Sequence, residues 1–231
     1  MIFGAKTDIG KVREHNEDSF GCKDNLFVVA DGMGGHRAGE IASSIAVETI
    51  LAGAISQIDE AGLKRLILEA NDAILAEAEN NPELAGMGTT VAVLVVFPEK
   101  AIVAHIGDSR IYRYTAEGEL IRLTDDHSLV AELVKRGELT ETEAKDHPHR
   151  NMLTRALGTK GTVEVETMVI PVKPGDRFML CSDGLTGMVD EDTIGQVLAG
   201  NETPTEMAEQ LVALAVERGG MDNVTVVIVE I

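Results

Sequence analysis

Four aspartates have similar positions relative to apolar segments of the chain. Asp31, Asp108 and Asp183 each follow a hydrophobic stretch, and Asp222 precedes one. If these segments are strands that end at one edge of a sheet assembly, the carboxylates converge and raise one another's pKa. Divalent cations relieve such repulsion, and oxygen ligands alone favour Mg²⁺ or Mn²⁺ over zinc. Two ions about 3.5–4 Å apart could activate a shared water and bind a phosphoryl group.

A glycine-rich loop follows the first of these acids. Gly32, Gly34 and Gly35 let the backbone turn sharply and approach a ligand closely. The Asp31 carboxylate beside an exposed carbonyl suits a hard cation. An Asp-Gly pair after a strand is also a common plain turn, so this loop gains weight only because acids recur at other strand ends. Nucleotide binding is a poorer interpretation, because no Gly-Lys-Ser/Thr sequence follows.

A cation and further acids share one short segment near the N-terminus. Arg13 precedes Asn16, Glu17 and Asp18. A guanidinium binds phosphate oxygens through two parallel hydrogen bonds, so Arg13 could hold a substrate phosphate. The alternative is a surface ion pair, which is the ordinary state of an exposed arginine.

Composition narrows the class of protein. The chain has 231 residues, 44% of them hydrophobic, and a formal charge of −19, which disfavours nucleic-acid binding. Because no apolar run reaches the length of a membrane span and no signal peptide is evident, we expect a cytoplasmic protein without a membrane segment. Cys22 and Cys181 do not form a disulfide framework, and we interpret both as small buried hydrophobic residues.

Hydrophobic periodicity predicts the elements that must position these residues. Helical spacing of apolar residues indicates helices at 38–55, 60–79, 128–136 and 204–217. Apolar, β-branched runs indicate strands at 26–29, 91–97, 101–106, 111–114, 163–170, 177–181 and 224–229. Short connections between neighbouring strands predict antiparallel pairing. Helices segregated between strand runs predict a layered α+β architecture.

Eight short motifs lie in a fixed order along nearly the whole chain. They are Arg13…Asn16-Glu-Asp-Ser19, Asp31-Gly-Met-Gly-Gly-His36, Gly88-Thr-Thr90, Gly107-Asp-Ser-Arg110, Asp126-His127, Leu153-Thr-Arg-Ala-Leu-Gly158, Ser182-Asp-Gly184 and Asp222-Asn223. Together they closely resemble the metal-dependent Ser/Thr protein phosphatases of the 2C type, in their compact bacterial form.

The resemblance implies a fold and a domain organisation. It predicts a four-layer α-β-β-α sandwich, with two antiparallel sheets between helical layers and the metals at one end of the sheets. Residues 1–231 would form a single catalytic domain. A flap excursion at about 128–152 would shape substrate access.

The resemblance also implies a set of metal ligands. Asp31 would bridge two Mn²⁺ or Mg²⁺ ions, and the Gly32 carbonyl would bind one of them. Asp183 and Asp222 would hold the other ion. Asp18 would act through bound waters.

Further implied roles concern a third ion, the phosphate and the proton donor. Asp108 with Asp183 matches a third-metal position, Glu17 is a second candidate for contact through water, and Arg13 would bind the substrate phosphate. Some family members have histidine directly after the metal-binding Asp-Gly, where this chain has Met33. His36 could instead protonate the leaving alkoxide, although it could also be a structural residue of the loop or be replaced by a metal-bound water.

The catalytic set predicted here is therefore Arg13, Asp31, Asp183 and His36. The predicted activity is hydrolysis of phosphoserine and phosphothreonine in proteins by a metal-bridged water, opposing a bacterial Ser/Thr kinase. We expect a monomer. The alternative is a non-catalytic, metal-bound phosphoprotein-binding regulatory module, which predicts the loss of a metal ligand. Asp31, Asp183 and Asp222 are all present, which favours the enzyme.

Overall fold

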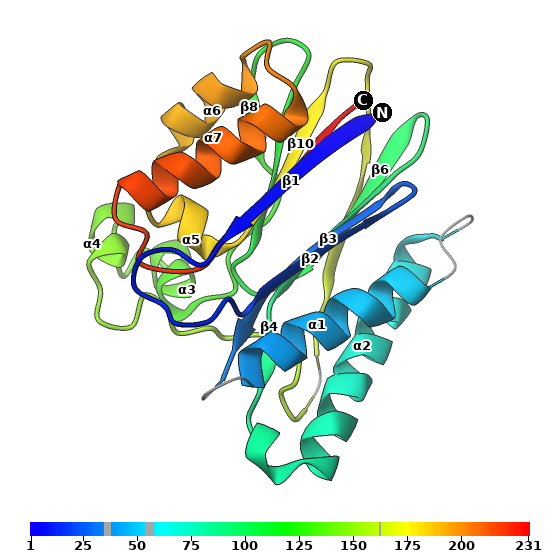
Figure 1. Ribbon diagram of the computed structural model, residues 1–231, viewed down its shortest axis with the longest axis vertical. Coiled ribbons are helices and arrows are strands. Elements are labelled where there is room, and N and C mark those ends of the chain that lie inside the picture. Colours follow the sequence, from blue (N-terminus) through cyan, green and yellow to red (C-terminus); the bar gives the residue numbers. More distant parts are fainter. Residues whose placement is uncertain (35–37, 54–57, 162) are drawn as a thin grey trace.

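Two antiparallel sheets form the centre of the protein (Figure 1). The computed structural model describes residues 1–34, 38–53, 58–161 and 163–231. The first sheet has the spatial order β1 (Ile2–Asp8), β11 (Val224–Glu230), β10 (Arg177–Cys181), β7 (Arg110–Tyr114) and β8 (Leu120–Arg122). The second has the order β2 (Asp18–Lys23), β3 (Leu26–Met33), β5 (Val91–Val96), β6 (Lys100–Ile106) and β9 (Glu166–Pro171), with β4 (Gly88–Thr89) paired to β3.

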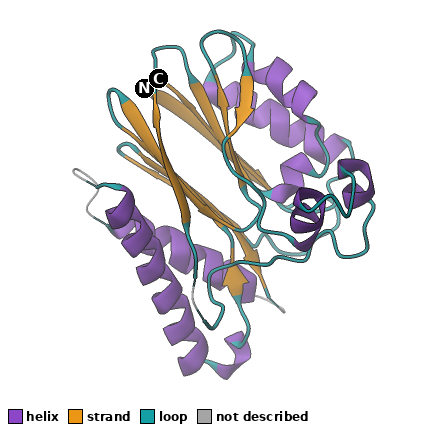
Figure 2. Ribbon diagram, turned by 180° about the vertical axis from the view of Figure 1, so that it is seen from behind, coloured by secondary structure: helices purple, strands orange, loops and turns teal. Residues whose placement is uncertain are grey.

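Helices cover the outer face of each sheet (Figure 2). The long helices α1 (Ala38–Ala52) and α2 (Glu60–Asn80) pack on the second sheet, whereas α6 (Glu191–Leu198) and α7 (Pro204–Glu217) pack on the first. A third apolar cluster, which includes Phe27, Leu94, Phe178 and Val227, lies between the two sheets. The predicted four-layer α-β-β-α sandwich is confirmed.

Strand β3 shows why its sequence is apolar without a break. Leu26 and Val28 pack in the cluster beneath α1 and α2, while Phe27 and Val29 pack in the cluster between the sheets. Successive side chains of a strand point to opposite faces, and here both faces are buried. The run therefore places a rigid strand in the middle of the sandwich, directly before Asp31.

The predicted elements exist, with some shifted bounds. Strand β3 continues past 26–29 to Met33 because Thr90 N–H donates to the Asp31 carbonyl and Gly32 pairs with Thr89. The acid thus lies inside a paired strand rather than at the start of a loop. Helix α1 ends at Ala52, before residues 54–57, which are outside the described residues, and β9 starts at Glu166 instead of 163. Helix α6 and the short helix α5 (Asp183–Thr186) were not predicted.

The segment 128–152 leaves the sandwich and returns to the same place. It contains two short helices, α3 (Leu129–Lys135) and α4 (Glu141–Lys145). A short 3₁₀ helix, η1 (Pro82–Leu84), lies outside this segment. Ser128 forms an isolated β-bridge with Leu153, so the two ends of the segment lie side by side. Across the described ranges, none of the helices is both long enough and apolar enough to cross a membrane.

Candidate metal centre

The acids predicted from the sequence converge at one end of the sandwich. Asp18 at the start of β2 is directly opposite Asp31 on β3. Asp183 opens α5 immediately after β10, and its carboxyl lies beside that of Asp31. Asp222 precedes β11, whose other end pairs with the N-terminal residues, so the site lies far from the chain termini (Figure 1).

Desolvation and mutual repulsion raise the pKa of Asp31, Asp108 and Asp183, which are half-buried. Burial raises the pKa of Asp31 well above its usual range, and the charges of Asp18, Asp183, Asp108 and Asp222 raise it further. For Asp108, burial and then the charge of Asp183 raise the pKa to about 8. The pKa of Asp183 is also raised, first by burial and then by Asp222. The predicted convergence of these acids is therefore present in the fold.

Asp18 provides the clearest sign that a cation fits here. Its Oδ2 accepts hydrogen bonds from Ser182 Oγ and Thr225 Oγ1, both at 2.7 Å. Its Oδ1 is buried and has no hydrogen-bond partner in the described part of the chain. Burial raises the pKa of Asp18 to about 7 despite the two hydroxyl donors. A buried carboxylate oxygen without a donor is costly, and a hard cation or its coordinated water would satisfy it.

The Gly88-Thr-Thr90 motif connects Asp31 to the turn that carries Asp108. Asp31 N–H donates to Thr90 Oγ1 at 3.0 Å, and Thr90 Oγ1 shares a 2.6 Å hydrogen bond with Ser109 Oγ. Thr89 Oγ1 donates to the Asp31 carbonyl at 2.9 Å. These contacts fix the backbone on both sides of the cluster, so the two carboxylates have defined positions before any ion binds.

Two glycines allow the backbones around the site to approach closely. A Cβ at Gly32 would lie 2.1 Å from the Gly39 carbonyl oxygen and 2.5 Å from that of Glu17. A Cβ at Gly184 would lie 2.0 Å from the Asn223 carbonyl oxygen. No side chain fits at such distances, so these positions require glycine. The Gly184 contact brings Asp183 next to the Asp222-Asn223 turn.

Asn223 fixes the N-terminal loop that carries Arg13. Its Oδ1 accepts from Glu17 N–H at 2.8 Å, and its Nδ2 donates to the carbonyls of Ile9 at 3.0 Å and His15 at 2.9 Å. The sequence identified Asn223 as part of a motif but gave it no role. Ser182 and Thr225, which hold Asp18, were likewise without a predicted role.

Arg13 lies at the edge of the acidic cluster. Its NH2 donates to Asp222 Oδ2 at 2.7 Å, and 48% of its side chain is exposed. The hydrogen bond to Asp222, together with the charges of Asp222, Glu17 and Asp31, raises the pKa of Arg13. The ion pair that was the alternative interpretation is present, and its partner is one of the predicted metal ligands. Arg13 is therefore in reach of a group bound at the cluster.

Glu17 and His36 are the two remaining residues predicted from the sequence. Glu17 is half-buried, burial raises its pKa, and its carbonyl accepts hydrogen bonds from Gly32 N–H at 3.1 Å and Ser43 Oγ at 2.6 Å. His36, the predicted proton donor, lies outside the described residues.

Comparison with known proteins places this chain in a family. A family model described as "Protein phosphatase 2C" matches residues 11–215. The serine/threonine phosphatase Stp of Listeria monocytogenes is 43% identical over 239 residues, which cover 97% of this chain and 94% of that protein.

Solved structures agree with the family match. The crystal structure of the Mycobacterium tuberculosis serine/threonine phosphatase PstP/Ppp matches with a TM-score of 0.93 at 39% identity, covering 100% of this chain and 98% of that one. A structure of the PstP catalytic domain in complex with two manganese ions matches with a TM-score of 0.91 at 38% identity, covering 99% and 97%. This chain therefore belongs to the protein phosphatase 2C family.

Proposed function

We propose that this protein is a metal-dependent Ser/Thr phosphatase that hydrolyses phosphoserine and phosphothreonine in proteins without a phospho-enzyme intermediate. The observation that carries the proposal is the half-buried aspartate cluster with the buried, unsatisfied Oδ1 of Asp18, in a chain 43% identical to a named Ser/Thr phosphatase. When bound, divalent cations would supply an activated water and neutralise phosphoryl charge. The protein then contributes mainly positioning and electrostatic stabilisation.

Each acid has a proposed place around the cations. Asp31 would bridge two ions, the Gly32 carbonyl would contact one, and Asp183 and Asp222 would hold the other. Asp18 would contact the ions through water, which accords with its unpartnered oxygen. We propose Mn²⁺ or Mg²⁺, since all these donors are oxygens and a related structure carries two manganese ions.

Three further residues complete the proposed site. Asp108, whose pKa is raised by the nearby Asp183 charge, would share a third ion with that residue. Arg13 would exchange its ion pair with Asp222 for the substrate phosphate, which a guanidinium binds through two hydrogen bonds. His36 remains the proposed donor of a proton to the leaving alkoxide, on the basis of its place in the sequence five residues after Asp31.

The wider organisation is proposed on the same basis. Residues 1–231 would act as one catalytic domain in a monomer, and the segment at about 128–152 would be a flap over the substrate. A Ser/Thr kinase would supply the phosphorylated protein. Among the described residues both cysteines are free thiols, which accords with a cytoplasmic site of action.

The test compares Asp183→Asn and Asp222→Asn with the unaltered protein. With Mn²⁺ present, we expect both variants to lose hydrolysis of p-nitrophenyl phosphate and of phosphothreonine peptides, because each removes a proposed ligand. Glu209→Gln, an exposed change on α7, is the matched control for loss of one negative charge. Full activity in a correctly folded Asp183→Asn variant would refute the assignment. If the unaltered protein binds metal but turns over no phosphopeptide, the regulatory-module alternative is correct.

A further inference from the structure

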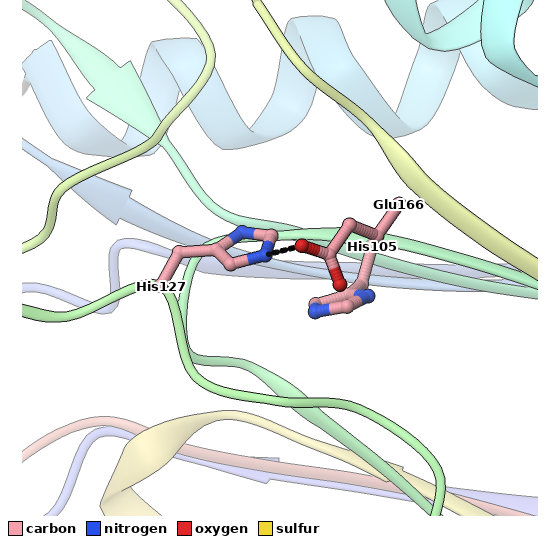
Figure 3. A group of neighbouring side chains, drawn as sticks. All are labelled: His105, His127 and Glu166. Carbon is pink, nitrogen blue, oxygen red and sulfur yellow. Dashed lines mark ion pairs between the residues drawn. The ribbon is translucent and has the colours of Figure 1, made fainter. Parts of the chain in front are cut away.

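A second group of metal-ligating residue types lies outside the aspartate cluster. His105 on β6, His127 after β8 and Glu166 on β9 have potential ligand atoms that all lie within 4.8 Å of one another (Figure 3). Both histidines are buried, whereas Glu166 is exposed. Residue type alone would suggest a metal site separate from the aspartate cluster. The hydrogen bonds of these side chains indicate a different role.

His127 has no lone pair left for a cation. The backbone N–H of Gly107 donates to His127 Nδ1 at 3.1 Å, and an amide nitrogen can only donate. A ring nitrogen that accepts a hydrogen bond bears no proton, so the ring is neutral and its single proton lies on Nε2, and burial, which lowers the pKa of His127, acts in the same direction. That nitrogen lies 3.1 Å from Glu166 Oε1, the contact drawn in Figure 3.

Arg155 further disfavours a cation at this place. Its NH1 donates to the same Glu166 Oε1 at 2.8 Å and lies 3.3 Å from His127 Nε2. A guanidinium is always charged and would repel a metal ion bound to these atoms. The three side chains therefore form a chain of hydrogen bonds in which Glu166 accepts from Arg155 and His127.

The His127 end of this series of hydrogen bonds holds the turn before Asp108. Besides accepting from Gly107 N–H, His127 donates its own backbone N–H to the Gly107 carbonyl at 3.0 Å. Gly107 has φ +100, and a Cβ there would lie 2.6 Å from the Thr90 side chain. Glycine adopts this conformation easily and is not confined to it. The clamp by His127 on one side and Thr90 on the other is thus what fixes the turn.

His105 and Arg110 hold the segment between β8 and the flap, in which His127 lies. His105 Nε2 donates to the Asp125 carbonyl at 2.8 Å, and its ring stacks on that of His127 with centroids 4.6 Å apart. Arg110 makes two hydrogen bonds to the Asp126 carboxylate, at 2.8 and 2.6 Å. With the two preceding residues held in this way, His127 has little freedom to follow a moving Gly107.

We infer that Arg155, Glu166 and His127 are positioning residues that hold Asp108 in place through Gly107 and so set the affinity for a third cation. The inference rests on the proposed function, which assigns Asp108 to that ion. Residues that orient a metal ligand without touching the metal commonly change affinity by about 10–100-fold when removed. Here the effect on cation affinity would pass through the backbone turn at Gly107, which precedes Asp108.

The first experiment measures Mn²⁺ binding by calorimetry and electron paramagnetic resonance. We expect His127→Ala to weaken the third, weakest binding step by about tenfold and to leave the two tighter steps unchanged. His127→Asn can present an amide oxygen at the place of Nδ1, and we expect it to bind close to the unaltered protein. Glu166→Leu should give a smaller loss in the same direction. His149→Asn, an exposed change in the flap segment, is the matched control.

A second measurement does not depend on a variant that folds. Long-range ¹H–¹⁵N spectra of the unaltered protein report which ring nitrogen of His127 carries the proton. A proton on Nε2 supports the inference, and a proton on Nδ1 overturns it. An ion that is bound by the unaltered protein and lost in Glu166→Leu, with the aspartate sites filled, would also overturn it in favour of a metal site.

The outcomes separate this inference from the proposed function. If the unaltered protein binds three ions and His127→Ala binds all three equally well, the positioning role is wrong while the phosphatase assignment stands. If the unaltered protein binds only two ions and still hydrolyses phosphopeptides, the third site is wrong and the inference is refuted with it. If it hydrolyses nothing, the proposed function itself is refuted.

Discussion

Replacing Asp18 by asparagine should stabilise the metal-free protein while weakening metal binding. The asparagine oxygen can still accept hydrogen bonds from Ser182 and Thr225, which now reach Asp18 Oδ2 at 2.7 Å. Its NH₂ group would take the place of the unpartnered Oδ1. There it would carry no charge, so the repulsion from Asp183 and Asp222 would be lost. The change therefore removes a buried negative charge without opening a cavity.

The size of the effect follows from the raised pKa of Asp18. The pKa moves from the ordinary 3.8 to about 7 in the folded protein. At 1.36 kcal/mol for each pKa unit, ionised Asp18 lowers the free energy of unfolding by about 4 kcal/mol above pH 7. Burial is the largest cause of the shift, and an asparagine at the same place is also removed from water, so we expect the substitution to recover about half, or about 2 kcal/mol. For a chain of this length that raises Tm by about 4–8 °C.

The direction of the pH dependence provides a second check. An acid with a raised pKa costs stability as pH rises from its unfolded pKa toward its folded pKa, because the unfolded chain loses the proton first. The advantage of Asp18→Asn should therefore be largest at pH 8 and small near pH 4, since the folded protein holds Asp18 neutral at low pH.

The assay is thermal unfolding in EDTA at several pH values, repeated with saturating Mn²⁺. Ligand binding to the folded state adds stability according to its affinity, so Mn²⁺ should stabilise the unaltered protein more than Asp18→Asn. Glu209→Gln on α7 removes one exposed charge from a chain of net charge −19 and controls for general repulsion. If Asp18→Asn melts at or below the unaltered protein at pH 8 without metal, the buried negative charge of Asp18 is not what lowers the stability of the metal-free protein.

Three further outcomes follow from the structure. Arg13→Ala should raise KM for a phosphopeptide about tenfold with less change in kcat, as expected for a lost charge-assisted contact; unchanged steady-state constants would exclude that role. Gly184→Ala should lower Tm strongly, because its Cβ would lie 2.0 Å from the Asn223 carbonyl oxygen, whereas Gly195→Ala has 3.7 Å of space and should not. Asp176→Ala removes the fully buried carboxylate that pairs with Arg113 and should cost about 3–5 kcal/mol in denaturant unfolding without altering Mn²⁺ affinity.

Local signals in the sequence were enough to locate many elements. Helix α7 matches the predicted 204–217 because a capping box between Thr203 and Glu206, with Pro204 in the first turn, marks its start. Strand β10 matches 177–181 because a turn and a motif bound a short apolar run. Prediction failed where pairing partners decide the bounds. Strand β9 is an edge strand paired only with β6, and its start depends on where that partner ends.

In the candidate site, the acids could be predicted from the sequence, whereas the residues that hold them in place could not. Aspartates at strand ends could be found from the sequence because each is next to an apolar run that fixes where it lies. Ser182 and Thr225 could not, because a hydroxyl is compatible with almost any surface position and both partners lie far from Asp18 along the chain, 164 and 207 residues away. Their role exists only after two sheets have packed.

There is a physical reason why residues far apart in the sequence are needed to hold the acids. A cluster of like charges tends to push apart the strands that carry it, so it persists without a bound cation only if neutral groups from other parts of the fold hold those strands in place. Asn223 and Thr90 accept hydrogen bonds from the backbone N–H groups of Glu17 and Asp31, and Ser182 and Thr225 donate directly to the Asp18 carboxylate. Because both sheets supply these groups, packing of the sandwich and formation of the metal centre are one event, and damage to either should be seen in both.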